Sequence, residues 1–227
     1  KDKLPDYVGA DVYDLQILTP SRKSNVGVER LNKIMQDFLN PADAIKQERQ
    51  VGDVTFREGD KVMQIKNNYD VPWFKDGENG TGVFNGDIGI LTRIDRANDI
   101  INVRFDDKEA MYSIENVKEI ELAYAMTVHK SQGSEFAAVV LPTIATPPKL
   151  SYRNLFYTAL TRARNLLIIV RKDHLQQGHN VFFCHRRVLE QNKQQHHKGN
   201  KSHNDKKSRR YSALVHFLSV DNVAFFK

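Results

Sequence analysis

Two uninterrupted apolar runs in the second half of the chain constrain its fold most. Residues 136–141 (FAAVVL) and 166–170 (LLIIV) contain no polar position, which is typical of parallel strands buried on both faces. Residues 153–164 lie between them and carry apolar side chains at helical spacing. The order strand, helix, strand predicts an α/β domain built on a parallel sheet.

The N-terminal part repeats this alternation of strand and helix. Residues 12–19 (VYDLQILT) predict a short strand that ends at Pro20, because proline cannot continue a central ladder. Apolar side chains then recur at helical spacing over residues 26–39, and the pair Asn40-Pro41 ends the pattern. We therefore expect a strand, a loop and a helix in succession.

The middle of the chain has a different character. Between residues 54 and 121, short β-prone runs (KVMQI, VFNGDIGILTRI, IINVRF and AMYSI) alternate with turn signals. Residues 85–87 (NGD) and 96–99 (RAND) are typical turn sequences, and residues 75–82 contain so little apolar content that they predict a mobile loop. The α/β domain is thus expected to be interrupted by a small closed β-barrel.

Positive charge is concentrated near the C-terminus. The net charge is +6, yet residues 171–210 hold 11 Lys and Arg against three acidic residues, so the rest of the chain is slightly acidic. This stretch predicts a low-complexity, partly disordered segment that is more typical of a soluble appendage than of a DNA-binding surface. Residues 211–227 regain apolar spacing and predict a short helix.

Composition limits the other classes of site. The single cysteine, Cys184, allows no intrachain disulfide, and no apolar stretch reaches the roughly 18 residues of a membrane span or forms a signal-peptide core, so we expect a cytoplasmic protein. No metal site is expected, because the spacing of the possible ligands fits no standard zinc finger. Those ligands are His179, Cys184, His185, His196 and His197.

Two polar segments flank the buried runs and carry the chemistry. Residues 127–136 (TVHKSQGSEF) place hydroxyl, imidazole and ammonium groups on a short turn, where a glycine allows close approach to a phosphate. Residues 155–164 (LFYTALTRAR) place Arg162 and Arg164 near the end of a helix, a position from which a guanidinium can reach a phosphate.

These segments resemble motifs V and VI of superfamily-one DNA helicases, in the form found in the RecD/TraA group, which includes the exodeoxyribonuclease V alpha subunit. Residues 17–32 (ILTPSRKSNVGVERLN) are similar to motif IV of that group, and KKSRRYSALVHFL (206–218) is similar to its C-terminal helix. The resemblance implies a second RecA-like motor domain of the P-loop-NTPase type, interrupted by an SH3-like β-barrel. The implied parts are motor residues 1–52, barrel residues 53–121, motor residues 122–170, the basic stretch 171–210 and the helix 211–227.

The resemblance also implies roles for individual residues. Arg162 would be an arginine finger on the γ-phosphate of ATP, and Arg22 a second catalytic phosphate contact. Gly133 and Glu135, together with Arg162, would bind the nucleotide. Single-stranded DNA would be contacted through its backbone by Thr127, His129, Lys130 and Ser131, and by Asn67 and Tyr69 of the barrel.

The pattern G-x-x-x-x-G-K-[ST] occurs nowhere in the sequence. We therefore expect ATP and Mg²⁺ to be bound only with an N-terminal motor domain that carries the P-loop, and the chain alone to be inactive. The implied parent is an ATP-dependent helicase, 5′ to 3′ by analogy, acting on single-stranded DNA in unwinding, repair or recombination, with no membrane partner. Two alternatives are a nucleic-acid-binding module without a motor and a fragment of a conjugative relaxase-helicase.

Overall fold

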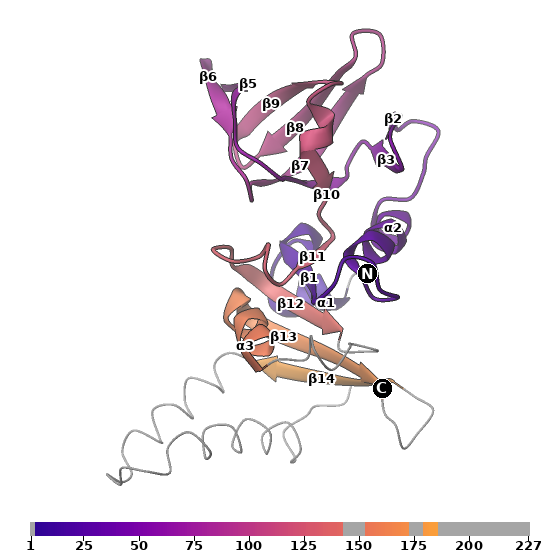
Figure 1. The fold of residues 1–227 in the computed structure, drawn as a ribbon, viewed down its shortest axis with the longest axis vertical. Helices are drawn as coiled ribbons and strands as arrows, with labels where there is room; N and C mark the ends of the chain where they lie inside the picture. Colours follow the sequence, from indigo (N-terminus) through magenta and orange to yellow (C-terminus); the bar gives the residue numbers. More distant parts are fainter. Residues whose placement is uncertain (1–2, 143–152, 173–178, 186–227) are drawn as a thin grey trace, which may run out of the picture. The chain divides into compact units, whose positions relative to one another are not determined.

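A computed structural model describes residues 3–142, 153–172 and 179–185 (Figure 1). The chain divides into two compact units. One comprises residues 19–134, and the other comprises the described residues before 19 and after 134. Each unit is described by itself.

The second unit is built on a sheet in which strands β1, β12, β13 and β14 are neighbours in that order. β1 pairs with β12 in parallel, β12 pairs with β13 in parallel, and β14 is antiparallel to β13. The helix α3 connects β12 to β13 along the chain, so the predicted strand, helix and strand are confirmed. The elements are α1 (Lys3–Val8), η1 (Val12–Asp14), β1 (Leu15–Thr19), β12 (Phe136–Pro142), α3 (Arg153–Arg162), β13 (Ala163–Lys172) and β14 (His179–His185).

Register places small and branched side chains together in this sheet. Leu15 lies opposite Ala138, and Ala138 lies opposite Leu166. Ala138, Leu166 and Ile168 are buried, and partly buried apolar side chains pack against them, namely Val8, Leu15, Val140 and Val170. The apolar runs are therefore buried, as parallel strands require.

The structure corrects the prediction for part of the basic stretch. Residues 179–185 (HNVFFCH) form β14, in which Phe183 pairs with Ile168 and Val181 pairs with Val170. The short β-prone centre VFFC finds a partner strand, which was not evident from the polar residues around it. The rest of residues 173–210 and the predicted helix 211–227 lie outside the described residues.

The first unit contains an antiparallel seven-stranded sheet in the order β10-β4-β7-β8-β9-β5-β6. Its strands are β4 (Lys61–Gln64), β5 (Asn68–Lys75), β6 (Glu78–Val83), β7 (Ile88–Asp95), β8 (Ile100–Phe105), β9 (Lys108–Ser113) and β10 (Ile120–Leu122). A separate hairpin, β2 (Glu48–Val51) and β3 (Val54–Arg57), precedes it. The helix α2 (Val28–Leu39), η2 (Val117–Glu119) and β11 (Ala125–Thr127) complete the unit. The predicted all-β module is confirmed.

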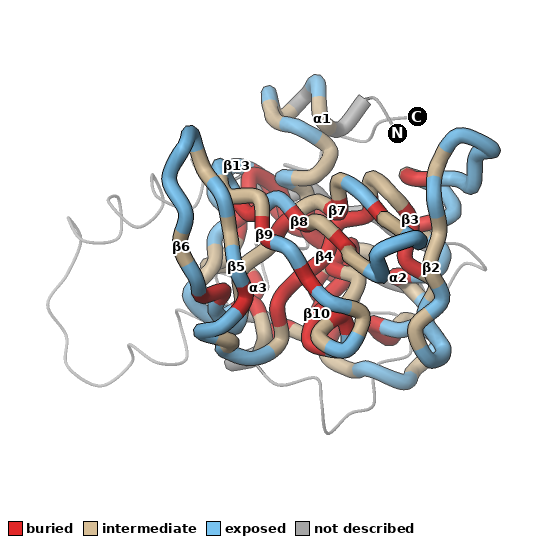
Figure 2. The backbone as a smooth tube through the Cα atoms, turned by 90° about the horizontal axis from the view of Figure 1, so that it is seen from above, coloured by how far each residue is buried: buried red, intermediate tan, exposed pale blue. Residues whose placement is uncertain are grey.

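The core packed on this sheet is mainly apolar, and it contains the buried pair Tyr112 and Gln64. Every residue of β4 is buried, and Figure 2 colours this strand accordingly. Tyr112 is fully buried, and its hydroxyl donates to Oε1 of Gln64 at 2.8 Å. Burial, together with the charges of Glu119 and Asp87, raises the pKa of the Tyr112 hydroxyl, so it stays protonated. The apolar core includes Phe56, Val62, Val71, Val83, Leu91, Ile94, Ile101, Val103, Phe105, Val117 and Ile120.

Residues 75–82 do not form the predicted mobile loop. They belong to the β5–β6 hairpin, whose turn at Asp76 and Gly77 has φ values of 47° and 89°. Trp73 explains the glycine at position 80, because a Cβ added to Gly80 would lie 2.2 Å from the indole ring. Trp73 packs against the barrel core, whereas its neighbour Phe74 is half exposed.

The helix α2 (Val28–Leu39) matches its prediction, but the face that it buries is unexpected. Asn32 and Gln36 are buried, whereas Ile34 and Phe38 are about half exposed. The buried polar side chains donate to the backbone carbonyls of Leu122 in β10, Ala125 in β11 and Thr55 in β3. Among the described residues, no helix is long and apolar enough to cross a membrane.

Candidate functional site

The loop before α2 holds Arg22 at the start of that helix. The hydroxyl of Thr19 donates to the carbonyl of Val26 at 2.6 Å, and the amide of Glu29 donates to the carbonyl of Arg22 at 3.2 Å. Gly27 allows this fold, because a Cβ there would lie 2.4 Å from the Arg22 carbonyl oxygen. The backbone of Arg22 is thus fixed while its side chain remains exposed.

A second loop, residues 127–134, follows β11 and is folded by its own polar groups. The amide of Lys130 donates to the Thr127 hydroxyl at 3.2 Å, and the amide of Ser131 donates to the Thr127 carbonyl at 3.2 Å. Gly133 has a φ of 93°, a conformation that side chains other than glycine rarely adopt. His129 and Gly133 are exposed, and Lys130 is partly exposed.

Ser131 differs from the prediction that its side chain faces DNA. It is fully buried, and its hydroxyl donates to the carbonyl of Val128 at 2.8 Å. This bond closes the turn of the loop, so the Ser131 side chain has a structural role here. The Thr127 hydroxyl likewise accepts a bond within the loop.

The two loops meet at one carboxylate. Nη2 of Arg22 lies 3.1 Å from Oε1 of Glu121, and Nζ of Lys130 lies 3.0 Å from Oε2 of the same side chain. Burial acts to raise the pKa of Glu121, but the bonds from Arg22 and Lys130 outweigh it, and the pKa is lowered. Glu121 is therefore ionised at neutral pH and neutralises charge from both loops.

Sequence reasoning missed Glu121. It lies in β10, at the end of the barrel, and Arg22 is separated from it by 99 positions in the chain. Nothing in the local sequence distinguishes it from the other carboxylates of the barrel. Only the tertiary structure brings it to Arg22 and Lys130.

The remaining predicted nucleotide residues belong to the second unit. Arg162 is the last residue of α3 and is partly buried, with Nη2 3.4 Å from the Thr161 hydroxyl. Arg164 was predicted on the same helix, but it lies in β13 and is exposed. Glu135 is exposed immediately before β12. The strand β13 begins at Ala163, so the helix α3 ends at Arg162.

The predicted barrel contacts lie near the start of β5. The side chain of Asn67 accepts a bond from the amide of Asn85 at 2.9 Å, which joins two turns. Tyr69 is 65% exposed, and its ring meets that of Phe84 edge to face, with centroids 5.8 Å apart. This leaves an exposed aromatic pair on the barrel, and the side chain of Lys66, three positions before Tyr69, is also exposed.

Lys66 is itself paired with a nearly buried carboxylate. Its Nζ lies 2.8 Å from Oε1 of Glu119, and Nδ2 of Asn68 donates to Oε2 at 2.7 Å. Burial acts to raise the pKa of Glu119, but these bonds outweigh it and lower the pKa. Glu119 thus anchors both side chains that flank Asn67.

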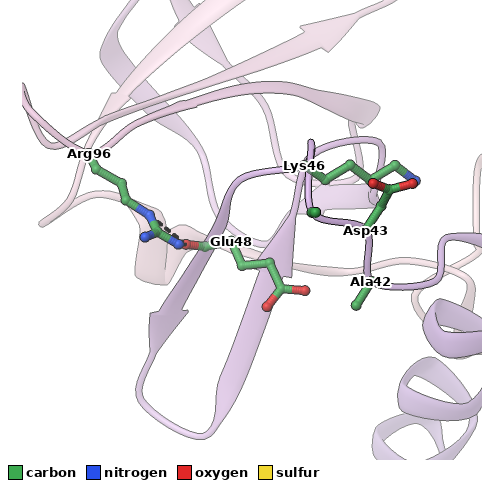
Figure 3. Close-up of a pocket in the computed structure, with 6 residues that line it drawn as sticks. Ala42, Asp43, Lys46, Glu48 and Arg96 are labelled. Carbon is green, nitrogen blue, oxygen red and sulfur yellow. Dashed lines mark hydrogen bonds between the residues drawn. The ribbon is translucent and has the colours of Figure 1, made fainter.

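Figure 3 shows a surface hollow elsewhere in the first unit, in which two of the cationic side chains are already bonded within the protein. The guanidinium of Arg96 donates to the main-chain carbonyl of Glu48 at 2.7 and 3.1 Å, and Lys46 bonds to the side chain of Asn40. The hollow is lined by Ala42, Asp43, Ala44, Lys46, Glu48 and Arg96. Within the described ranges, no group of three or more His, Cys, Asp and Glu side chains is placed to hold a metal ion.

Two family models match the chain. Residues 31–105 match the SH3 domain of ATP-dependent RecD-like DNA helicases, and residues 122–170 match the UvrD-like helicase C-terminal domain. This chain belongs to the RecD-type helicase family. Its fold combines an α/β sheet with an SH3-like antiparallel β-module, and it corresponds to the C-terminal part of these helicases.

Individual relatives of the RecD type are also similar in sequence to this chain. The ATP-dependent RecD2 DNA helicase of Deinococcus radiodurans is 36% identical over 66% of this chain and 19% of its own length. The RecBCD enzyme subunit RecD of Haemophilus influenzae is 31% identical over 68% of this chain and 21% of its own length. The chain thus spans about a fifth of the curated relatives that it matches. A solved structure of Pif1 helicases at forked DNA has 18% identity and a TM-score of 0.45, over 78% of this chain and 44% of that chain.

Proposed function

We propose that this chain is the C-terminal part of an ATP-dependent DNA helicase and that it binds single-stranded DNA through backbone phosphates. The observation that carries the proposal is the meeting of Arg22 and Lys130 at Glu121. Two cations from loops far apart in sequence converge on one anionic group, and phosphate is the anion that DNA presents to such donors.

On the DNA side, Lys130, His129 and the Thr127 region contact the strand backbone. Contacts of this kind hold DNA without distinguishing its sequence. Tyr69 and Asn67 extend the surface on the barrel, where an exposed aromatic ring can stack on a base. Ser131 supports the loop from inside.

On the nucleotide side, Arg162 acts as the arginine finger, with Gly133 and Glu135 beside the nucleotide. Arg22, expected from the resemblance to be a second contact to the nucleotide phosphates, is instead assigned to the DNA side, because it shares Glu121 with Lys130. The P-loop and the bound Mg²⁺ come from an N-terminal motor domain, so the 227 residues alone do not hydrolyse ATP. Closure of the two motor domains around ATP and their reopening would move the DNA, 5′ to 3′ as the family analogy implies. The parent would act in the cytoplasm, in unwinding, repair or recombination.

The DNA contact is tested by fluorescence anisotropy with a labelled oligo-dT. Lys130→Ala should weaken binding and reduce the salt slope by about one, because one phosphate contact is lost. Lys23→Ala removes the same charge from an exposed position beside Arg22 and serves as the control. Equal affinities for the two variants would contradict the role of Lys130.

A second function, a nucleic-acid-binding module without a motor, is favoured by the exposed pair Tyr69 and Phe84. Such a module would lose binding in Tyr69→Ala and would show no DNA-stimulated ATP hydrolysis when a motor domain with a P-loop is supplied. Hydrolysis in that experiment would exclude it.

A further inference from the structure

Glu121 presents both carboxylate oxygens to cations at a position that solvent reaches. One oxygen contacts Arg22 and the other contacts Lys130. The three side chains are 29% (Glu121), 44% (Arg22) and 32% (Lys130) exposed, so a dissolved anion has access to the cluster. The three residues form a charged cluster with one anion between two cations.

The backbone at each member of this cluster is fixed separately. Glu121 is held in β10, where it is in register with Met63 of β4. The Arg22 loop folds back on the start of α2, and the amide of Lys130 is bonded to Thr127. The backbones of the three segments therefore hold the three charged side chains close together.

Carboxylate and phosphate oxygens accept the same bonds from guanidinium and ammonium groups. We propose that Glu121 is the resident counter-ion of a two-cation phosphate site, and that a DNA backbone phosphate binds Arg22 and Lys130 by displacing the Glu121 carboxylate. This inference rests on the proposed function, because it takes the DNA contact of Lys130 as given.

The exchange has an energetic consequence. A phosphate must replace two ion pairs and approach a like charge, so Glu121 lowers the affinity for DNA. An exposed ion pair contributes only a fraction of the energy of a buried one, and its removal changes affinity by roughly two- to fivefold. Glu121 keeps Arg22 and Lys130 paired when no DNA is bound, and the energy needed to displace it makes the binding of the DNA phosphate readily reversible.

The test compares the affinity of the 227-residue chain and its variants for labelled oligo-dT at low and high salt. Glu121→Gln should tighten binding by roughly two- to fivefold at low salt, and the gain should shrink as salt rises. Structural damage would weaken binding, so tightening is not a signature of a disturbed fold. Circular dichroism and the fluorescence of Trp73 check that the fold of the variant is retained.

Two further variants make the result specific. Glu115→Gln removes the same charge from an exposed position between β9 and η2 and should leave the affinity unchanged. In the double variant Glu121→Gln with Lys130→Ala, the gain should shrink, because Glu121 then pairs with Arg22 alone. Equal tightening by Glu115→Gln, no tightening by Glu121→Gln, or an undiminished gain without Lys130 would overturn the proposal.

The single variants separate this inference from the proposed function. If Lys130→Ala weakens binding and Glu121→Gln has no effect, only the counter-ion role fails. If Lys130→Ala has no effect, the DNA contact itself fails, and the counter-ion role fails with it.

Discussion

The side-chain amide of Asn32 holds both polar backbone groups of Ala125. The amide of Ala125 donates to Oδ1 of Asn32 at 2.7 Å, and Nδ2 of Asn32 donates to the Ala125 carbonyl at 3.0 Å. Nδ2 also reaches the carbonyl of Leu122 at 2.8 Å. Because Ala125 begins β11, the helix α2 fixes the backbone that leads into the loop 127–134.

Asn32→Ala should lower the free energy of unfolding by about 3 kcal/mol, because three backbone groups lose their partner in a buried place. Urea unfolding followed by Trp73 fluorescence measures the change. Lys33→Ala, at the exposed neighbouring position of the same helix, is the control and should stay within about 0.5 kcal/mol of the unsubstituted chain. Similar stabilities of the two variants would contradict the importance of this contact.

Asp60 is a second buried junction between α2 and the barrel. Its oxygens accept bonds from Gln36 at 2.6 Å, Asn40 at 2.8 Å, the Arg57 amide at 2.7 Å and the Tyr124 hydroxyl at 2.9 Å. Asp60→Asn puts an amide group that donates where only acceptors fit. We expect a loss of about 2–3 kcal/mol in urea unfolding. An unchanged midpoint would show that the network contributes nothing.

The same carboxylate predicts a pH dependence. Burial raises the pKa of Asp60 above its ordinary 3.8, although its hydrogen bonds act to lower it. The folded state therefore takes up this proton at a higher pH than the unfolded state. The contribution of Asp60 protonation to the free energy of unfolding is fully present below pH 3.8, and it is lost as the pH rises through the raised pKa of the folded state. The stability difference between the native chain and Asp60→Asn should grow as pH falls; a shrinking difference would contradict this.

Gly133→Ala tests whether the shape of the loop 127–134 matters for binding. The φ of 93° is strained for alanine, by about 1–2 kcal/mol, whereas an added Cβ would meet no atom within 4 Å. The loop should therefore relax to another shape, and oligo-dT affinity should fall. Gly77→Ala imposes similar strain at φ 89° in the β5–β6 turn, again without a clash. Equal affinities for the two variants would argue against a role for the loop.

Much of the fold was predictable, because apolar runs and turn residues act locally. The runs FAAVVL and LLIIV were recognisable as parallel strands, and the turn at 96–99 lies between β7 and β8 as expected. Residues 75–82 were misinterpreted as a mobile loop, although they belong to the β5–β6 hairpin. At Gly80 a side chain would clash with the Trp73 ring, and this contact is visible only when the two strands are paired.

The candidate site was predictable in part. Arg22 and Lys130 were identified from their segments, but their common partner Glu121 was not, because the three residues meet only in the folded chain. Likewise, helical spacing identified α2 without showing that Asn32 and Gln36 face inward. A polar side chain can be buried when backbone groups satisfy it, and periodicity of apolar residues does not detect such a case.

The central claim is that this chain supplies the arginine finger of a DNA-dependent ATPase, and one assay tests it most directly. The N-terminal motor domain of the parent is supplied, and ATP hydrolysis is measured with and without single-stranded DNA. Arg162→Ala should reduce turnover by roughly 10³–10⁵-fold with nucleotide binding retained, whereas Arg104→Ala, an exposed arginine of β8, should not. Unchanged DNA-stimulated turnover in Arg162→Ala would contradict the account.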